Sequence, residues 1–562
     1  MSTITLRIDG MTCEGCAAVV EKALSSVQDV RVAEVSYAEQ RATVEVDGRG
    51  NSEEILRAIA DAGYRAVVEE TTRREFAGDG TVRGHHDRDH GGGRHLLILG
   101  AGSAAFAAAI RAAELGARVT MVERGTLGGT CVNVGCVPSK TLIRAADIRH
   151  LRLHHPFDGI PRKNGRVDAA RLVKQKRELV ERLRRAKYRD VLSEYPAITY
   201  VEGEARFIDA KTVAVSQPDG TTQGLTADRI LIATGSHPWS PSIPGLGMLP
   251  YWTNVEALEA EEIPGRLIVV GGSAVGAELA QMFARLGSSV TLLEALPTLV
   301  PNEDSDLGDA LAECFRDEGI DVHTGVKVRA VSRGKKGPYR VVADVGDVER
   351  VFHGDELLMA TGRRASVEAL DLRTAGVETD DRDFVRVDDR LRTSRADIYA
   401  AGDCTPLPQF VYVAAKAGTV AAENAVGSGE ARLDLSAMPA VTFTDPQVAS
   451  VGLTELRARE REPAVVSRIL PMEHVPRALA NRDTRGLIKI VAREGDERIL
   501  GIHVLSPAAG EVIQTAALAL KLGVTVSELG EALFPYLTEV EGLKLAAQTF
   551  SRKVENLSCC AG

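Results

Sequence analysis

The sequence predicts an α/β protein with two doubly wound domains, an α+β domain after them and a small βαββαβ domain before them. Two segments, beginning near residues 95 and 266, repeat the order strand, glycine-rich turn, helix and strand. In both segments the second strand ends on an acidic residue, Glu123 in the first and Glu294 in the second. A chain of 562 residues is also too long for one core, because domains usually contain about 100 to 200 residues. We therefore expect several folded units arranged around an internal repeat.

The charge pattern does not favour a nucleic-acid partner. Lys and Arg total 68 and Asp and Glu total 78, so the formal net charge is −10, and the charges are interspersed rather than gathered into a basic stripe. The opening MSTITLRIDG has no basic segment leading into an apolar one, so we expect no secretory signal. Apolar runs such as residues 96–110 contain glycine and stop short of the ~18 residues that span a bilayer. We expect a cytoplasmic protein without membrane insertion.

The cysteines are few but paired. In a reducing compartment, close pairs more often indicate metal binding or redox chemistry than structural disulfides. These pairs are therefore the first candidate functional residues. Six of the eight cysteines form three close pairs, which are Cys13 with Cys16, Cys131 with Cys136 and Cys559 with Cys560, while Cys314 and Cys404 stand alone.

Residues 1–68 are the first expected domain. Strand-like and helix-like stretches alternate in the order βαββαβ, from ITLRIDG to YRAVVE, which predicts a ferredoxin-like unit. Cys13 and Cys16 open its first helix in GMTCEGC, a spacing shared by metal sites and thioredoxin-like redox motifs. The short βαββαβ context and GMTC resemble heavy-metal-associated domains, which implies that the two thiols bind a soft metal ion. Residues 69–94 are polar and glycine-rich, and we expect a flexible linker there.

The first repeated segment has the spacing of a dinucleotide-binding, Rossmann-like turn. Gly100, Gly102 and Ala105 lie between a strand and a helix, where small residues let the backbone approach a pyrophosphate at the helix N-terminus. Glu123 is placed to accept hydrogen bonds from a ribose. The strand, the helix and the acidic residue at the right distance make this pattern far more specific than the glycines alone.

The second repeated segment reads GGSAVG from Gly271 to Gly276, with a serine at the middle glycine position. Serine is small enough to be tolerated there. Glu294 lies where a ribose 2′-hydroxyl is bound, and no arginine follows at once to receive a 2′-phosphate, so this position favours NADH over NADPH. The family resemblance given below suggests NADPH instead, and both nucleotides stay open.

Cys131-Val-Asn-Val-Gly-Cys136-Val-Pro-Ser-Lys140 is the most specific stretch of the chain. This spacing allows two sulfurs to come within bonding range at the start of a helix, whose N-terminus stabilises a thiolate. Together with the preceding turn, the motif resembles the pyridine nucleotide-disulfide oxidoreductases over residues 95 to about 550. The resemblance implies that a nicotinamide nucleotide reduces FAD and that FAD reduces the cysteine disulfide. Cys136 would then lie against the flavin, and Cys131 would exchange with the substrate.

The same resemblance implies a domain order and further cofactor residues. Lys140 matches the family lysine near the flavin, and Glu278 matches its ion-pair partner. We expect an FAD-binding domain over 95–235 and 361–437, an inserted NAD(P)-binding domain over 236–360, and a dimerisation domain with a Cys-Cys tail over 438–562. The other residues expected at the cofactors are Gly129, Thr130, Ala233, Thr234, Gly235, Gly362 and Asp403.

Residues near the C-terminus indicate the substrate. Family enzymes that reduce disulfides carry a His-Pro-Thr segment, because a leaving thiolate needs a positioned acid. Here the stretch is FPYLTE, and Phe534 cannot transfer a proton. Cys559 and Cys560 supply two adjacent thiols, and soft thiolates select soft metal ions. The absence of this acid and the presence of two further thiols favour a metal ion over a disulfide as the substrate.

The stretches FPYLT, VEGLKLAAQTF and LSCCAG closely resemble the mercuric reductases within this family. The resemblance implies a homodimer with a shared active site, in which Cys559 and Cys560 of one subunit take Hg(II) from thiol complexes. They pass it to the inner cysteine pair of the other subunit, where it is reduced to Hg(0). Tyr188 and Tyr536 match tyrosines that line the metal site, and the N-terminal domain would supply Hg(II).

Two alternatives stay open at this point. A dihydrolipoamide-dehydrogenase-like enzyme would explain the redox pair, although Phe534 and the thiol tail speak against it. A metal chaperone or buffer would explain Cys13 and Cys16, although it leaves two nucleotide folds without a purpose.

Overall fold

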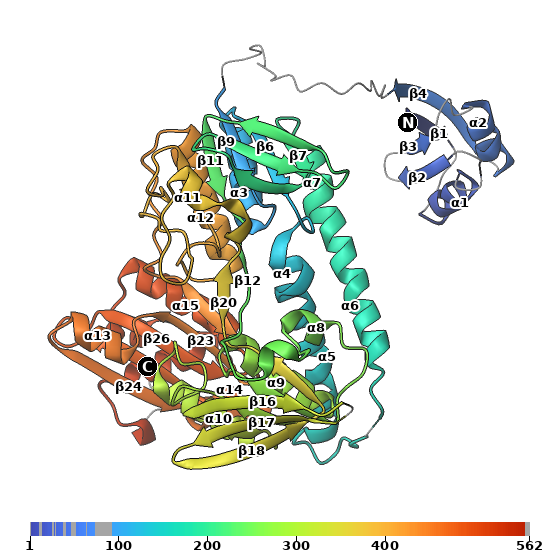
Figure 1. The fold of residues 1–562 in the computed structure, drawn as a ribbon. Coiled ribbons are helices and arrows are strands. Elements are labelled where there is room, and N and C mark those ends of the chain that lie inside the picture. Colours follow the sequence, from blue (N-terminus) through green and yellow to red (C-terminus); the bar gives the residue numbers. More distant parts are fainter. Residues whose placement is uncertain are drawn as a thin grey trace. The chain divides into compact units, whose positions relative to one another are not determined.

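The computed structural model divides into two compact units, residues 1–91 and 92–562 (Figure 1). No helix in the described part of the chain is long and apolar enough to cross a membrane. The described residues are 2–9, 14–24, 27, 30–36, 41–46, 52–62, 64–73, 93–163, 165–335 and 337–556.

The first unit is an antiparallel sheet, ordered β2-β3-β1-β4, packed against two helices. Alternate residues of β1, such as Ile4 and Leu6, are buried with Val20 and Ile59 of the helices. This alternation is typical of a strand with one buried face, and the expected βαββαβ order is confirmed. The elements are β1 (Ser2–Asp9), α1 (Glu14–Leu24), β2 (Val30–Ser36), β3 (Arg41–Val46), α2 (Ser52–Asp61) and β4 (Arg65–Arg73).

Strand β4 extends to Arg73, beyond the residue at which the linker was expected to begin. Its last residues pair with the start of β1, where Ser2 lies opposite Arg73 and Thr3 lies opposite Thr72. Because β1 supplies backbone partners to a polar stretch, the apolar pattern alone could not predict this part of the strand. Residues 74–92 of the expected linker lie outside the described residues.

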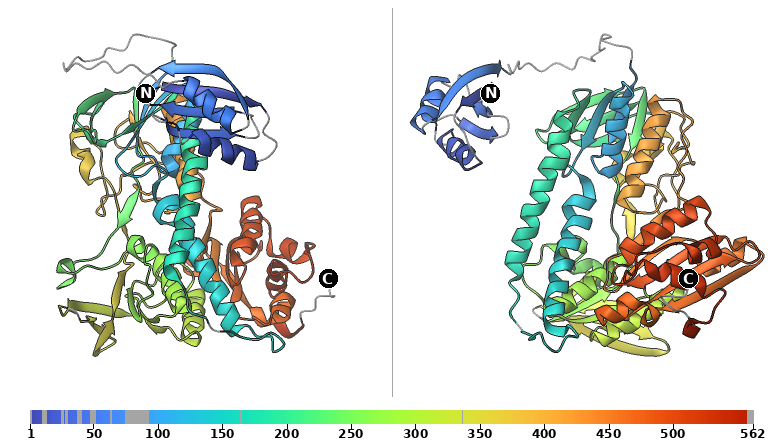
Figure 2. Two further views of the ribbon diagram at one scale, coloured as in Figure 1. Left: turned by 90° about the vertical axis from the view of Figure 1, so that its right-hand side faces the viewer. Right: turned by 180° about the vertical axis from the view of Figure 1, so that it is seen from behind.

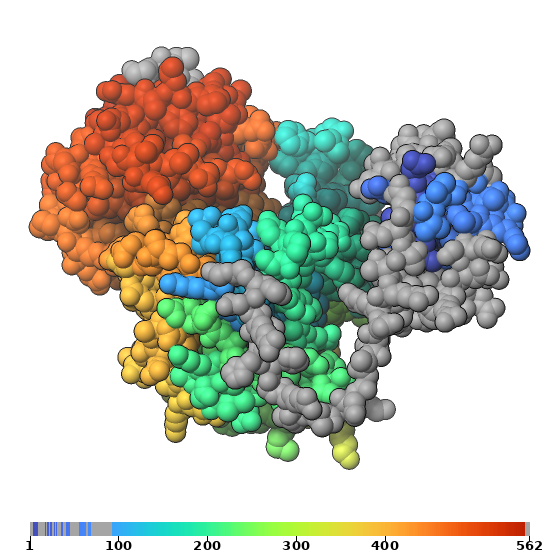
Figure 3. Space-filling model, turned by 90° about the horizontal axis from the view of Figure 1, so that it is seen from above, coloured from blue at the N-terminus to red at the C-terminus, as the bar shows by residue number. Residues whose placement is uncertain are grey.

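A parallel sheet ordered β21-β11-β5-β6-β7 forms the first doubly wound domain. Helices α3 and α12 cover one face and lie side by side, although about 300 residues separate them in sequence (Figures 1 and 3). The small sheet β8-β9-β10 covers the other face. The elements are β5 (His95–Leu99), α3 (Ser103–Glu114), β6 (Arg118–Glu123), β7 (Ile198–Glu202), β8 (Glu204–Phe207), β9 (Thr212–Ser216), β10 (Thr222–Thr226), β11 (Arg229–Ile232), β21 (Ile398–Ala400) and α12 (Val411–Val426).

The second doubly wound domain repeats this plan with the parallel order β15-β14-β13-β19. Helix α9 begins directly after the second glycine turn, and the antiparallel sheet β16-β17-β18 packs on the other face. The chain passes between the two domains twice, and the crossings β12 and β20 pair with each other. The elements are β12 (Ser236–Pro238), α8 (Asn254–Leu258), β13 (Arg266–Val270), α9 (Ala274–Leu286), β14 (Ser289–Leu293), α10 (Ser305–Asp317), β15 (Asp321–His323), β16 (Val326–Arg333), β17 (Tyr339–Val345), β18 (Val348–Gly354), β19 (Glu356–Met359) and β20 (Arg363–Ala365). The next helix, α11 (Leu372–Ala375), packs in the core of the first doubly wound domain.

Two long helices follow the first glycine turn and run beside each other (Figure 2). Leu142 and Ala146 of α5 are buried in the core of the second doubly wound domain. The helix that begins at Cys136 therefore ties the two nucleotide folds together. The elements are α4 (Gly129–Val134), α5 (Cys136–His154), α6 (Ala169–Arg184), a π-helical turn (Arg185–Arg189) and α7 (Asp190–Ser193).

The C-terminal domain is an antiparallel sheet ordered β22-β23-β26-β25-β24 with helices packed against it. Every residue of its central strand β26 is buried. The expected α+β domain is thus present after the two nucleotide folds. The elements are β22 (Pro439–Thr442), β23 (Gln447–Gly452), α13 (Glu455–Arg461), β24 (Val465–Pro471), α14 (Pro476–Asn481), β25 (Leu487–Arg493), β26 (Ile499–Ser506), α15 (Ala509–Leu522), α16 (Val526–Glu531) and α17 (Glu541–Gln548).

Candidate active site

Two glycines at the first glycine turn, Gly100 and Gly129, have no room for a side chain. A Cβ atom on Gly100 would lie 2.3 Å from the carbonyl oxygen of Ala233, and one on Gly129 would lie 2.6 Å from the Cα atom of Gly102. Gly102 is also the N-cap of α3 and provides no side-chain cap, so the first N–H groups of the helix stay available to a ligand. Ala105 is fully buried in α3. The turn therefore has the form of an anion-binding helix start.

The second glycine turn repeats these contacts. A Cβ atom on Gly271 would lie 2.3 Å from the carbonyl oxygen of Ala360, and one on Gly276 would lie 1.8 Å from the carbonyl oxygen of Gly271. Ser273, at the middle glycine position, is the N-cap of α9 in extended backbone and makes no side-chain cap bond. A serine thus fits this turn without closing the helix start.

The two acidic residues at the strand ends have the same local role. The Glu123 carboxylate accepts a hydrogen bond from the backbone N–H of Ala101 at 2.8 Å. Glu294 accepts from the corresponding N–H of Gly272, and also from that of Leu296 at 2.8 Å. Each carboxylate keeps oxygen lone pairs for a further donor, as ribose recognition requires.

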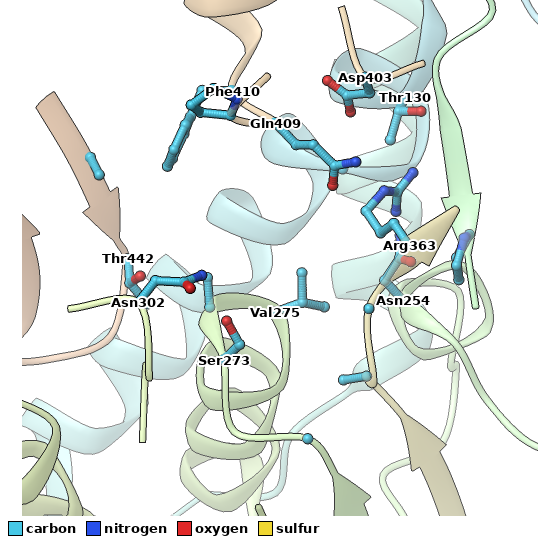
Figure 4. Close-up of a pocket in the computed structure, with 18 of the residues that line it drawn as sticks. Thr130, Asn254, Ser273, Val275, Asn302, Arg363, Asp403, Gln409, Phe410 and Thr442 are labelled. Atoms are coloured by element: carbon cyan, nitrogen blue, oxygen red, sulfur yellow. The ribbon is translucent and has the colours of Figure 1, made fainter. Parts of the chain in front are cut away.

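Both turns open into one continuous cavity of about 2130 Å³, which also contains the cysteine pair. Within it, Thr130 and Asp403 lie at one end of the close-up view and Ser273 at the other, with Arg363 projecting into the space between them (Figure 4). All the expected cofactor residues except Gly100, Ala105 and Gly276 line this cavity, and those three lie in the walls of the turns.

The end of the cavity beside the first turn contains polar groups that suit FAD. Burial raises the pKa of Asp403, and the nearby Arg363 guanidinium opposes this rise. The hydroxyl of Ser236 donates to the Asp403 carboxylate at 3.4 Å. The buried Thr234 hydroxyl has no hydrogen-bond partner among the described residues. A partly buried carboxylate and an unsatisfied hydroxyl beside a glycine cradle fit the polar groups of a dinucleotide.

The cysteine pair lies between the two turns, with both sulfurs as free thiols. Cys131 is part of α4, and Cys136 begins α5. A hydrogen bond with Cys131 and the charge of Lys140 lower the pKa of Cys136 to about 7, against the effect of burial. The same hydrogen bond and burial raise the pKa of Cys131. At neutral pH Cys136 is therefore partly thiolate, and the thiol of Cys131 stabilises that form.

The ion pair expected between Lys140 and Glu278 is present, with 2.7 Å between Nζ and Oε2. Lys140 also lies over the ring of Phe443, 4.8 Å from its centroid. The other oxygen of Glu278 accepts a hydrogen bond from the backbone N–H of Phe443 at 2.8 Å. Glu278 is buried, so α5, α9 and the segment after β22 meet at one satisfied carboxylate.

Comparisons with known proteins agree with this geometry. Residues 94–418 match the pyridine nucleotide-disulphide oxidoreductase family, residues 438–547 match its dimerisation domain, and residues 5–65 match the heavy-metal-associated domain. The mercuric reductase of Acidithiobacillus ferrooxidans is 49% identical over 99% of this chain and 98% of its own length. That of Shigella flexneri is 48% identical over 99% of this chain and 100% of its own length. The chain belongs to the mercuric reductase family.

A solved structure outside the mercuric reductases supports the fold. The HOCl-induced flavoprotein disulfide reductase RclA from Escherichia coli has a TM-score of 0.71 and 30% identity, and the match covers 81% of this chain and 99% of that one. The match of residues 438–547 to the dimerisation domain indicates a homodimer for this member of the mercuric reductase family.

Of the two tyrosines expected at the metal site of the family, the structure brings one to the cysteine pair. Tyr188 lies in the π-helical turn after α6, and its ring meets Phe106 edge to face at 4.8 Å. Burial and the charge of Cys131 raise the pKa of Tyr188, so its hydroxyl is neutral at ordinary pH. Tyr536 is an exposed residue between α16 and α17 and does not line the cavity within this chain. Phe534 packs against the core of the C-terminal domain.

The other cysteines fall into two groups. Cys314 and Cys404 are buried, and burial raises the pKa of Cys314 to about 11 and that of Cys404 to about 12. Buried thiols of this kind are unreactive, so we assign Cys314 and Cys404 a structural role in the core. The remaining expected ligands, Cys13, Cys559, Cys560 and the side chain of Cys16, lie outside the described residues.

Sequence reasoning missed several side chains that hold the site together. Arg363 lies beside Asp403 and donates to the hydroxyl of Ser236 at 2.8 Å. Asn133 and Asn254 bind the segment that carries the cysteines. The position of Asn133 between the two cysteines could have marked it as a residue of the site. The contact of Asn254 with Val134, 120 positions away, could not be predicted from the sequence.

Proposed function

We propose that this chain is an NAD(P)H-dependent flavoenzyme that reduces Hg(II) to Hg(0) and so detoxifies mercury. The observation that carries the proposal is the placement of a thiolate–thiol pair between two dinucleotide turns in one cavity. The full-length similarity to mercuric reductases supports the choice of substrate. When bound, FAD supplies two-electron transfer between a reduced nicotinamide and the cysteine pair.

The residues of the first turn would hold FAD. The glycine cradle and the open start of α3 suit its pyrophosphate, and Glu123 suits a ribose. Asp403 and the orphaned Thr234 hydroxyl would bind further polar groups. The second turn would hold the nicotinamide nucleotide, either NADH or NADPH, and the carboxylate of Glu294 favours NADH because it repels a 2′-phosphate.

The cysteine pair suits a soft, two-coordinate metal ion. Cys136 is partly ionised near neutral pH, and Hg(II) binding displaces the proton of Cys131 and any proton left on Cys136. Each transfer of Hg(II) is a ligand exchange between sulfurs, which needs no acid for a leaving thiolate. The apolar Phe534 at the position of the family's acid is consistent with this chemistry.

The remaining thiols would deliver the metal. Cys559 and Cys560 of one subunit would take Hg(II) from thiol complexes and pass it to the inner pair of the partner subunit. Tyr188 and Tyr536 would line that path, and Cys13 and Cys16 would capture Hg(II) ahead of it. A cytoplasmic location is part of the proposal, because close cysteine pairs that bind metal or exchange electrons are typical of a reducing compartment.

Steady-state turnover with volatile mercury trapped tests this proposal. We expect Hg(II) in excess thiol to drive NAD(P)H oxidation and release Hg(0), and Cys131→Ser to abolish both. Cys559→Ala with Cys560→Ala is expected to slow turnover with bulky thiol complexes of Hg(II). Turnover with a disulfide or dihydrolipoamide, without Hg(0), would contradict the proposal and return the chain to the thiol-disulfide enzymes.

A further inference from the structure

The segment between the redox cysteines is braced from within by one side chain. The Asn133 amide nitrogen donates to the carbonyl oxygen of Leu127 at 3.0 Å and to that of Gly129 at 2.8 Å. Both acceptors lie just before Cys131. Asn133 therefore folds the start of α4 against its own preceding loop and limits how far Cys131 can move.

A second side chain holds this brace from outside. Arg184 donates from Nε to the amide oxygen of Asn133 at 2.9 Å, and its Nη1 pairs with Glu181 at 2.6 Å. Arg184 is the last residue of α6, and the π-helical turn that contains Tyr188 follows it at once. Single π-helical turns within α-helices are frequent at functional sites. Here the turn lets Arg184 and Tyr188 reach the same cysteine segment.

A third side chain holds the other end of the segment. Asn254, the first residue of α8, donates from its amide nitrogen to the carbonyl oxygen of Val134 at 2.7 Å. Val134 precedes Gly135 and Cys136, so this bond lies close to the second sulfur. Asn254 lines the cavity below Arg363 in the close-up view (Figure 4).

We infer that Arg184, acting through Asn133, and Asn254 form a clamp that positions Cys131 and Cys136 and thereby sets the equilibrium between dithiol and disulfide. The inference rests on the redox role proposed above for the two cysteines. A disulfide forms only when the two Cβ atoms are about 3.5 to 4.5 Å apart. A clamp that holds the two thiols near this geometry raises their effective concentration toward each other, as fixed geometry does in any intramolecular reaction. The three clamp residues are positioning residues, because they act through the cysteine segment.

Equilibration with dithiothreitol of defined redox state measures this effect without Hg(II) and without nicotinamide. The cysteine disulfide gains two electrons to become a thiol at Cys131 and a partly ionised thiol at Cys136, while the reagent loses two electrons and two protons and closes its own cyclic disulfide. Any proton that Cys136 does not keep passes to the buffer. The variants are Arg184→Met, Asn133→Ala and Asn254→Ala, with Cys13, Cys16, Cys559 and Cys560 replaced by alanine so that only the inner pair is counted. We expect each variant to shift the equilibrium toward the dithiol by about fivefold to tenfold, and tenfold is about 30 mV for a two-electron couple.

Matched controls separate positioning from general damage. Arg184→Lys keeps a donor for Asn133 and is expected to restore most of the shift. Arg182→Met removes an exposed arginine from the same helix and is expected to leave the equilibrium unchanged. Arg184→Met combined with Asn133→Ala is expected to give no more than the larger single effect, because both break the same bond.

Each outcome has one meaning. A wild-type pair that forms no disulfide at any reagent ratio contradicts the proposed redox role itself. The clamp alone is contradicted if the wild-type pair forms its disulfide but the three variants change the dithiol–disulfide equilibrium constant by less than twofold. The variants are Arg184→Met, Asn133→Ala and Asn254→Ala. If Asn133→Ala fails to fold, Arg184→Met decides the question, because Arg184 lies at a partly exposed helix end.

Discussion

Lys140 and Glu278 form an ion pair of 2.7 Å that joins the helix beginning at Cys136 to the helix beginning after the second nucleotide turn. The two residues act on Cys136 with opposite sign, because the charge of Lys140 lowers its pKa and the charge of Glu278 raises it. The hydrogen bond with Cys131 is the largest influence on this pKa, and the ion pair adjusts how much of the sulfur is thiolate at neutral pH.

Lys140→Met is expected to raise the pKa of Cys136, while Glu278→Gln is expected to lower it. At neutral pH, the rate of Cys136 alkylation by iodoacetamide should fall roughly threefold or more in Lys140→Met, because only the thiolate reacts. The measurement is the alkylation rate against pH, in a protein that lacks the N-terminal and tail cysteines. A change of the same direction in both variants would show that the ion pair does not act by charge.

Glu294→Gln is expected to weaken the discrimination between the two nicotinamide nucleotides. The amide keeps an acceptor for the backbone N–H of Gly272 but removes the charge that repels a 2′-phosphate. We expect the ratio of the Kd for NADP+ to the Kd for NAD+ to fall about tenfold or more, measured by calorimetry on the FAD-loaded protein. Glu313→Gln, at an exposed position of α10, is the charge-matched control. Tighter binding of NADP+ than NAD+ by the unmodified protein would contradict the role given to Glu294.

Lys489→Met is expected to destabilise the contact between the second nucleotide domain and the C-terminal domain. The ammonium of Lys489 is buried and lies 3.1 Å from Asp304, 2.5 Å from Asp306 and 2.7 Å from Glu455. Removing it leaves the buried carboxylate of Asp304 without its cation, which costs about 3 to 5 kcal/mol of unfolding free energy. Urea unfolding measures this loss, and Lys521→Met, at an exposed position of α15, is the control. Equal urea midpoints for Lys489→Met and Lys521→Met would show that the ion-pair cluster around Lys489 contributes nothing to stability.

Acid is expected to weaken the same cluster. Burial opposes ionisation of Glu455, but hydrogen bonds with Lys489 and Arg459 outweigh it and lower its pKa from 4.5 to about 2. Because the folded pKa is below the unfolded one, this stabilisation is complete above pH 4.5 and is lost as the pH falls toward 2. Glu455→Gln should make the urea midpoint less dependent on pH between 5 and 3 than in the unmodified protein. An equal pH dependence of the urea midpoint in the two proteins would show that ionised Glu455 does not stabilise the fold.

The sequence predicts those parts of the structure that depend on local pattern. Both nucleotide turns, the acidic residues Glu123 and Glu294 and the cysteine helix follow from spacing within short segments, and the structure brings them into one cavity. The ion pair of Lys140 with Glu278 could be expected only from the family resemblance, because the two residues are 138 positions apart.

The rest depends on contacts that no local pattern encodes. The polar end of β4 is a strand only because β1 provides its partners. Arg184 meets Asn133 across 51 positions, and Lys489 meets Asp304 across 185. Such pairs are fixed by the packing of whole domains, so the clamp and the buried lysine cluster appear only in the folded chain.

The most direct test of the central claim is a single turnover without oxygen. Purified FAD-loaded protein whose cysteine pair has first been reduced with thiol receives one equivalent of NADH or NADPH and is then mixed with Hg(II) in excess thiol while volatile mercury is trapped. We expect one Hg(0) for each nucleotide oxidised, and none from Cys131→Ser or Cys136→Ser, because two electrons reduce one Hg(II) through the cysteine pair. Oxidation of the nucleotide without Hg(0), or equal Hg(0) from the cysteine variants, would contradict the assignment of this cavity as the site of mercury reduction.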